Sequence, residues 1–228
     1  MVLGRGIAAV MIDLDGTLLD TVPDIAAAAE RMLAALGLPV RPQEEVRNYI
    51  GKGIPKLVER CLRASTADAR ADALQPEALA LFEKFYFEES GRRSAAYPGV
   101  LDGLAQFRAM HLRLACVTNK AARFTLPLLE RTGLASWFEL VVSGDTLARK
   151  KPDPMPLAHI CAAFALAPAK VLVIGDSAND ALAARAAGCP VVCVSYGYNE
   201  GGDVHDLDCD AIVGSLSEAA DLLQSTKS

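Results

Sequence analysis

Short apolar runs recur along the chain, separated by segments in which apolar residues return every three or four positions. Runs of this length are typical of strands that are buried on both faces of a parallel sheet. Because helical spacing follows most of the runs, the alternation predicts a parallel sheet with helices on both faces. The predicted strands are 7–12, 112–117, 140–142, 171–174, 191–194 and the less apolar 211–213.

Between these strands, several segments show helical spacing. Some of them begin or end at residues that are typical of helix termini. Gly133 and Gly188 stand where a helix commonly ends on a glycine. Ser217 is the predicted N-cap of the last helix. The predicted helices of this part are 100–110, 123–132, 156–164, 179–187 and 217–223.

Residues 21–95 interrupt the alternation, since they contain no convincing strand. An insertion of roughly 70 residues far exceeds an ordinary connection, and its place after the first strand suits a lid. The alternative is a purely structural helical subdomain. The predicted fold is therefore α/β, with a core of 1–20 and 96–228 and an all-helical cap of 21–95. The predicted cap helices are 25–36, 43–49, 54–62 and 76–89.

Asp13 and Asp15 directly follow the first predicted strand. In an extended segment, residues two positions apart point to the same side, with Cα atoms roughly 6.6 Å apart. Two carboxylates this close require a cation, a shared proton, or both. The alternative is a strand that simply ends in a polar turn, where Asp-Gly is common.

Further polar residues fall at or after the ends of later predicted strands. In an open parallel sheet, ligands bind outside the carboxyl ends of the strands. Carboxylates suit a hard, octahedral Mg²⁺, and a lysine with a threonine hydroxyl suits phosphoryl oxygens. Each group alone is an ordinary turn feature, but together they predict one site. The groups are Thr118-Asn119, Lys150-Lys151, and Asp176 with Asp180.

Composition narrows the function classes. The 228 residues carry a net charge of −5 and lack a Lys/Arg cluster, which argues against a nucleic-acid binder. No apolar run approaches transmembrane length or the form of a signal peptide, so no membrane partner and a cytoplasmic location are expected. The six cysteines show no CxxC pair and are interpreted as small buried residues in a reducing compartment. The oligomeric state is left open.

The segments 13–17 (Asp-Leu-Asp-Gly-Thr) and 175–180 (Gly-Asp-Ser-Ala-Asn-Asp), with Thr118 and Lys151, resemble the four motifs of the haloacid dehalogenase superfamily. The resemblance covers almost the whole chain. It implies a Rossmann-like core, an inserted helical cap and a Mg²⁺-dependent phosphotransferase. Asp15 argues against two branches of the superfamily, because dehalogenases lack this aspartate and phosphonate-cleaving members carry alanine there.

The resemblance also implies residue roles. Asp13 is expected to be the nucleophile that forms an aspartyl-phosphate, and Asp15 to act first as the acid and then as the base. Thr118 and Lys151 are expected to hold the transferring phosphoryl group. Mg²⁺ is expected to be bound by Asp13, Asp176 and the main-chain carbonyl of Asp15.

Three further residues near these motifs are given less specific roles. Asp180 is expected to lie behind the metal ligands and to orient Lys151 or a metal-bound water. Its alternative role is that of an acid at a helix N-terminus, which the helix dipole favours. Asn119 is expected to contact the substrate. Lys120 is interpreted as a surface charge rather than a catalyst.

The cap segment 46–60 is similar to the cap loop of phosphoglycolate phosphatases. Its Gly51 and Gly53 allow the backbone to approach a small ligand, and Gly51 is a predicted substrate contact. Arg47 and Lys52 are expected to meet a substrate carboxylate. The alternative is a link between two helices with solvated basic residues. The apolar segment 82–88 is interpreted as cap core.

The predicted function is that of a Mg²⁺-dependent phosphomonoesterase whose substrate is a small phosphorylated metabolite. The resemblance favours 2-phosphoglycolate, which yields glycolate and phosphate. Alternatives within the class are a sugar-phosphate phosphatase, a pyrophosphatase or a phosphomutase. An alternative from another class is a phospho-accepting signalling module, although such modules are shorter and lack the insertion.

Overall fold

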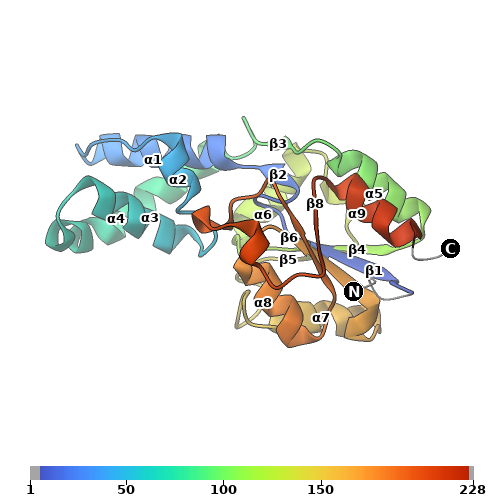
Figure 1. Cartoon of the computed structure of the whole chain (residues 1–228). Helices are drawn as coiled ribbons and strands as arrows, with labels where there is room; N and C mark the ends of the chain where they lie inside the picture. The colour runs from blue at the N-terminus through green and yellow to red at the C-terminus, as the bar shows by residue number, and fades with distance from the viewer. Residues whose placement is uncertain (1–5, 226–228) are drawn as a thin grey trace.

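Six parallel strands form one sheet in the order β5-β4-β1-β6-β7-β8 (Figure 1). The structure is a computed structural model that describes residues 6–225, so 1–5 and 226–228 of the expected core lie outside the described residues. All six predicted strands are present, because strands covered on both faces must be apolar throughout. They are β1 (Ala9–Ile12), β4 (Arg113–Val117), β5 (Leu140–Val142), β6 (Val171–Gly175), β7 (Val191–Val194) and β8 (Ala211–Val213).

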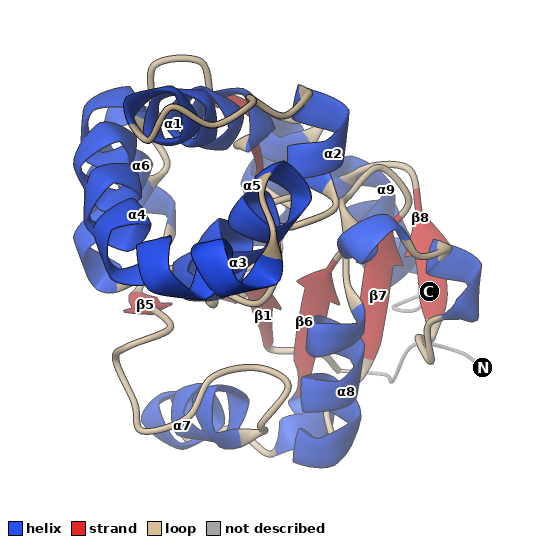
Figure 2. Cartoon of the chain, turned by 90° about the vertical axis from the view of Figure 1, so that its left-hand side faces the viewer, coloured by secondary structure: helices blue, strands red, loops and turns tan. Residues whose placement is uncertain are grey.

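Helices cover both faces of this sheet. Alternate residues of β1 point to opposite sides, so that Ile12 joins one buried cluster and Met11 joins another. The cluster around Ile12 includes residues of α5 (Val100–Ala109) and α9 (Leu216–Ser225). The cluster around Met11 includes residues of α7 (Met155–Phe164) and α8 (Ala178–Ala187), and Figure 2 shows α8 in front of β6 and β7. The predicted α/β fold with a helical insertion is confirmed.

The insertion forms a helical cap at one end of the sheet, on the left in Figure 1. Its buried cluster includes Leu33, Leu62 and Phe82, and Tyr86 is buried there as well. The helix α6 (Ala122–Arg131) of the core contributes Phe124 to this cluster, so the cap packs directly on the core. The cap helices are α1 (Val22–Ala35), α2 (Gln43–Arg47), α3 (Ile54–Ser65) and α4 (Asp68–Glu89).

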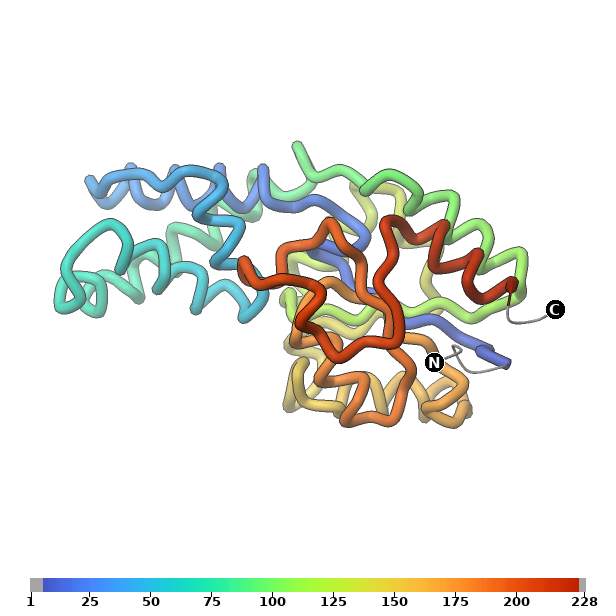
Figure 3. The backbone as a smooth tube through the Cα atoms, in the orientation of Figure 1, coloured from blue at the N-terminus to red at the C-terminus, as the bar shows by residue number. Residues whose placement is uncertain are grey.

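The chain crosses between core and cap twice, at neighbouring points (Figure 3). The two crossings are β2 (Leu19–Asp20) and β3 (Ala95–Ala96), which pair as a short antiparallel ribbon. Asp24 at the start of α1 fixes the returning segment. Its carboxylate accepts hydrogen bonds from the main-chain N–H groups of residues 91, 93 and 94 and from the Ser94 hydroxyl. Two-residue strands are too short for a periodicity to predict them.

The predicted start of α4 and the predicted N-cap of the last helix are wrong, and α1 begins at Val22, three residues before its predicted start. The helix α4 begins at Asp68 and continues through Pro76, which was its predicted first residue. Ala71 before the proline and Ala78 after it are both buried, so the helix packs on the cap core on both sides of Pro76. The last helix begins at Leu216, so that Ser217 lies in its first turn. Ser215 caps this helix instead, since its Oγ accepts the Glu218 N–H at 3.1 Å.

Among residues 6–225, no helix combines the length and the apolar character needed to cross a membrane.

Candidate active site

Asp13 leaves β1 beside Lys151, which comes from the connection between β5 and α7. The Lys151 Nζ donates to Asp13 Oδ1 at 2.8 Å, to Asp180 Oδ1 at 2.5 Å and to the Val117 carbonyl at 2.8 Å. Three acceptors match the three donors of an ammonium group. Burial alone lowers the pKa of Lys151, but the two carboxylates outweigh burial and raise this pKa. Lys151 is thus a fixed positive charge beside Asp13.

Asp176 leaves β6, the strand next to β1, and is buried near Asp13. Its Oδ1 accepts the Thr17 hydroxyl at 3.2 Å, and its Oδ2 accepts the Tyr198 N–H at 2.6 Å. Burial first, and then neighbouring carboxylates, raise the pKa of Asp13 to about 7 and the pKa of Asp176 to about 8. Burial and like charge thus both disfavour the ionised form of these two acids.

The donor set fits a hard divalent cation. Oxygens of Asp13, Asp176 and Asp180 lie within 4.8 Å of one another, and such oxygen-only sets suit Mg²⁺. Asp180 already has partners for both oxygens: Lys151 holds Oδ1, and Ser177 Oγ donates to Oδ2 at 2.7 Å. The partners of Asp176 are both neutral, and Asp13 pairs with Lys151 through Oδ1, so Asp13 and Asp176 are the better candidates to bind an ion.

Glycine is required beside this acid pair. Gly16 has φ +89°, and a Cβ there would collide with the Asp176 carboxylate. The Gly of the 13–17 segment therefore lets the loop after β1 pass close to the carboxylate that follows β6.

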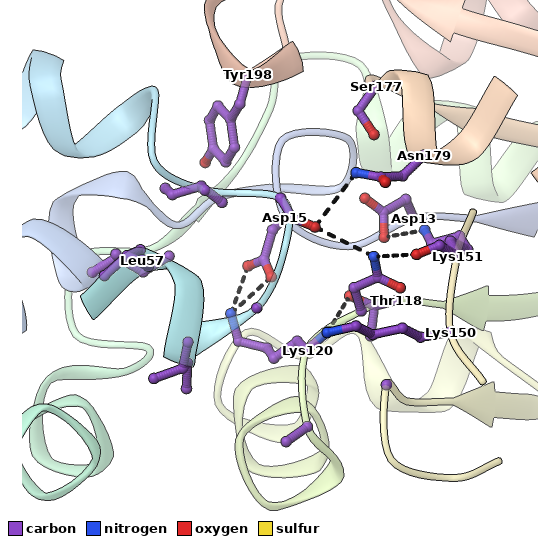
Figure 4. A pocket seen from close by; sticks show the side chains of 18 of the residues that line it. Asp13, Asp15, Leu57, Thr118, Lys120, Lys150, Lys151, Ser177, Asn179 and Tyr198 are labelled. Carbon is purple, nitrogen blue, oxygen red and sulfur yellow. Dashed lines mark hydrogen bonds and ion pairs between the residues drawn. The ribbon is translucent and has the colours of Figure 1, made fainter. Parts of the chain in front are cut away.

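Asp15 faces Lys120, as the dashed lines in Figure 4 show. The Lys120 Nζ lies 2.6 Å from Asp15 Oδ1 and 2.9 Å from Oδ2, and the Thr21 hydroxyl donates to Oδ1 at 2.6 Å. Lys120 is only 8% exposed, and its Nζ lies 5.0 Å from the centroid of the Tyr86 ring. The interpretation of Lys120 as a surface charge is wrong, because the cap helix α4 covers it with Tyr86.

Thr118 and Asn119 follow β4 and reach the same cavity as Asp13. The Thr118 Oγ1 accepts the Lys120 N–H at 3.2 Å. The Asn119 Nδ2 donates to the Lys151 carbonyl at 2.9 Å and to the Gly51 carbonyl of the cap at 3.3 Å. Asn119 thus joins the core to the glycine-rich cap turn, and Gly51 is one of the residues that line the cavity.

Arg47 and Lys52 are not among the residues that line this cavity. The Arg47 guanidinium donates to the carbonyls of Tyr196, at 3.0 Å, and Gly197, at 2.8 Å. The Lys52 Nζ lies 3.4 Å from Glu200 and its side chain is 53% exposed. Both cations therefore bind the loop after β7 in this structure.

Sequence reasoning missed Tyr198 in that loop. Besides its N–H bond to Asp176, its hydroxyl accepts the Thr21 N–H at 2.7 Å and donates to Asp20 Oδ1 at 2.9 Å. One residue thus contacts both the Asp176 carboxylate and the chain crossing at β2. The only signal in the sequence was an aromatic residue after a predicted strand, which is too general to assign a role.

The cavity has a volume of about 270 Å³ and two chemically different sides. The core contributes Asp13, Asp15, Thr118, Lys151 and Asp176. The cap contributes mainly apolar side chains. These are Ile25, Ile50, Ile54, Leu57, Phe82 and Tyr86.

The sequence matches the family model of the haloacid dehalogenase-like hydrolases over residues 10–194. The chain belongs to this family, as the motifs predicted.

Several curated relatives extend over nearly the same length. A phosphoglycolate phosphatase of Thiobacillus denitrificans is 55% identical over 215 residues, which are 94% of each chain. Another, of Nitrosospira multiformis, is 56% identical over 218 residues, or 96% of each chain. The crystal structure of a predicted phosphoglycolate phosphatase from Haemophilus somnus has a TM-score of 0.91 and 30% identity, covering 96% of this chain and 99% of that one. The protein is an enzyme, a phosphatase, and that prediction is confirmed.

Proposed function

We propose that the protein is a Mg²⁺-dependent phosphoglycolate phosphatase that acts through an aspartyl-phosphate on Asp13. The observation that carries the proposal is the position of Asp13 between a lysine and a second acid: Lys151 lies 2.8 Å away, and an Asp176 oxygen lies within 4.8 Å. The names of the two bacterial relatives support the choice of substrate.

In the first step, a carboxylate oxygen of Asp13 attacks the phosphorus atom, and the bond from phosphorus to the glycolate oxygen breaks. Asp15 gives its proton to that leaving oxygen. In the second step, a water attacks the phosphorus of the aspartyl-phosphate while Asp15 takes up its proton. Phosphate leaves, and the Asp13 carboxylate is regenerated.

Charge stabilisation supplies most of the acceleration for such reactions. Lys151 offsets the charge of Asp13 and of the transferring oxygens, and the Thr118 hydroxyl donates to one of them. A bound Mg²⁺, held by Asp13, Asp176 and the Asp15 carbonyl, would neutralise carboxylate and phosphoryl charge. Asp180 orients Lys151 through their 2.5 Å contact.

The cap closes the other side of the cavity and excludes water. Asn119 and the Gly51 carbonyl, which are hydrogen-bonded to each other, lie where the non-reacting end of the substrate enters. We place the boundaries of the cap at 21 and 95, next to the β2–β3 ribbon. We assign the enzyme to the cytoplasm, because all six cysteines are free thiols and five of them are buried.

The test is phosphate release by the purified enzyme with Mg²⁺ from 2-phosphoglycolate, glucose 6-phosphate and pyrophosphate. We expect kcat/KM for 2-phosphoglycolate to exceed the other values by about 100-fold or more, because a site built for a carboxylate leaves polar groups unpaired with other substrates. A higher kcat/KM for either competitor would replace the proposed substrate.

A further inference from the structure

One cation at the cavity differs from the others in its partners. Buried cations require a carboxylate partner, as Lys120 and Lys151 have here, whereas Lys150 is exposed and can remain without one. Within the part of the chain that the structure describes, Lys150 has no carboxylate within ion-pair distance, although its Nζ donates to the Lys52 carbonyl at 3.1 Å. The paired cations that line the cavity are Lys120 with Asp15, Arg123 with Glu83, and Lys151 with Asp13 and Asp180.

Lys150 reaches from the core to the glycine-rich turn of the cap. It directly precedes Lys151, so its main chain is held close to the reacting groups. Figure 4 draws its side chain among those that line the pocket. On the cap side, Gly53 has φ +90°, and a Cβ there would lie 3.0 Å from the Lys150 Nζ. The second glycine of the turn thus makes room for this amine.

The two cap cations predicted for the substrate carboxylate are already engaged. Arg47 makes two hydrogen bonds to main-chain carbonyls and lies over the Tyr198 ring. Lys52 is paired with Glu200. Binding a substrate through either residue would require breaking those contacts. Lys150 would only exchange the neutral Lys52 carbonyl for a charged carboxylate, which forms the stronger hydrogen bond.

We propose that Lys150 binds the carboxylate of the substrate and thereby selects phosphomonoesters that carry a carboxylate close to the phosphoryl group. This inference rests on the proposed function, since it assigns the non-reacting end of that substrate. Lys150 is a specificity-determining residue: it acts on the carboxylate and leaves the chemistry at Asp13 unchanged.

The first experiment compares 2-phosphoglycolate with ethyl phosphate, which lacks the carboxylate. In Lys150→Met, kcat/KM for 2-phosphoglycolate falls by about 10- to 100-fold, the usual effect of losing a hydrogen bond to a charged group. The value for ethyl phosphate stays within about threefold, because its transition state never contacts Lys150. Lys150→Arg restores part of the preference, because it retains the charge.

Two further variants locate the effect. Arg149→Met removes the neighbouring cation of the same loop, which pairs with Asp153 outside the cavity, and should leave the preference intact. Lys52→Met tests the cap lysine. An equal loss on both substrates in Lys150→Met, or a selective loss in Lys52→Met with none in Lys150→Met, would overturn the proposal.

A second experiment does not depend on the physiological substrate. Hydrolysis of p-nitrophenyl phosphate is inhibited with 3-phosphonopropionate or with propylphosphonate, which has the same length but no carboxylate. We expect wild type to bind the former at least about tenfold more tightly and Lys150→Met to lose this difference. A difference that persists in the variant refutes the role of Lys150, whereas wild-type turnover of 2-phosphoglycolate alone decides the proposed function.

Discussion

The two sides of the cavity are built in different ways. The core side consists of Asp13, Thr118, Lys151 and Asp176, which follow strand ends or neighbouring connections, are all buried, and are held by hydrogen bonds or ion pairs. The cap side consists mainly of apolar side chains on helices and on the turn around Gly51. The sheet therefore holds the polar groups of the core side in place, whereas the cap closes the rest of the cavity mainly with apolar surface.

Polar contacts join the two sides at several points. The Gly51 carbonyl accepts Asn119 Nδ2 at 3.3 Å and Asn179 Nδ2 at 3.5 Å. Lys120 bonds Asp15 on the core side and lies against Tyr86 of the cap. Variants on each side, and at the contacts between them, should therefore separate loss of chemistry from loss of alignment.

The largest effect is expected from Asp13→Asn, which removes the nucleophile from the core side. Turnover of every substrate should fall by at least about 10⁴-fold, measured as phosphate release at saturating Mg²⁺. Acid-quenched samples should contain no labelled phospho-enzyme. Asp221→Asn, at an exposed position of α9, is the matched control, and activity within tenfold of wild type in Asp13→Asn would remove this residue from the mechanism.

Asp176→Asn should weaken Mg²⁺ binding while leaving the cap side untouched. Because the variant loses one of two carboxylates able to bind the ion, the Mg²⁺ concentration for half-maximal activity should rise by about 100-fold or more. The measurement is a Mg²⁺ titration of activity, accompanied by a Mg²⁺-dependent shift of the melting temperature. An unchanged titration would show that the ion binds elsewhere.

The buried acids of the core side also predict a pH dependence of stability without metal. Their pKa values, about 7 for Asp13 and about 8 for Asp176, lie above the ordinary 3.8. Between about pH 4 and pH 8 the folded state therefore binds more protons than the unfolded state, and stability falls as pH rises.

In EDTA, urea unfolding at pH 5 and pH 8 should show this loss, and Asp176→Asn should reduce it by about 2 kcal/mol. Added Mg²⁺ should reduce it as well, because an ion favours the charged carboxylates. A wild-type protein that loses no more stability than the variant over this range would contradict the assigned shifts.

A smaller effect is expected from Lys120→Met, at the contact between the two sides. The substitution leaves Asp15 without its cation, so kcat should fall by about tenfold, while KM for 2-phosphoglycolate changes less. Lys120→Arg keeps the charge and should recover part of kcat. If both variants keep wild-type kcat, Asp15 needs no partner in order to transfer its proton.

The sequence predicted the core well for a physical reason. Strands such as β1 and β6 are buried on both faces and therefore appear as uninterrupted apolar runs, and their last residues must turn to the same edge of the sheet. Asp13, Thr118 and Asp176 could be grouped on that basis. Periodicity could not assign Lys120, because its burial depends on Tyr86, which comes from a helix in another part of the chain.

The contacts of the cap were harder to predict for the same reason. Arg47 and Lys52 are basic residues beside a glycine turn, but their partners lie in a loop about 150 residues later. Tyr198 acts partly through its main-chain N–H, which no side-chain pattern reveals. Pro76 misled the helix prediction, since a proline is usually read as a helix start.

Because β2 pairs with β3, the inserted helices could be replaced as a unit. Since Asp20 lies opposite Ala95 in the ribbon, the two ends of the insertion are adjacent, and a different insert with equally close ends could be grafted there without disturbing the sheet. Asp24 would have to be included in such an insert, because its carboxylate holds residues 91–94, which lead into β3. A replaced insertion would change the apolar side of the cavity while the strand ends of the core stay in place.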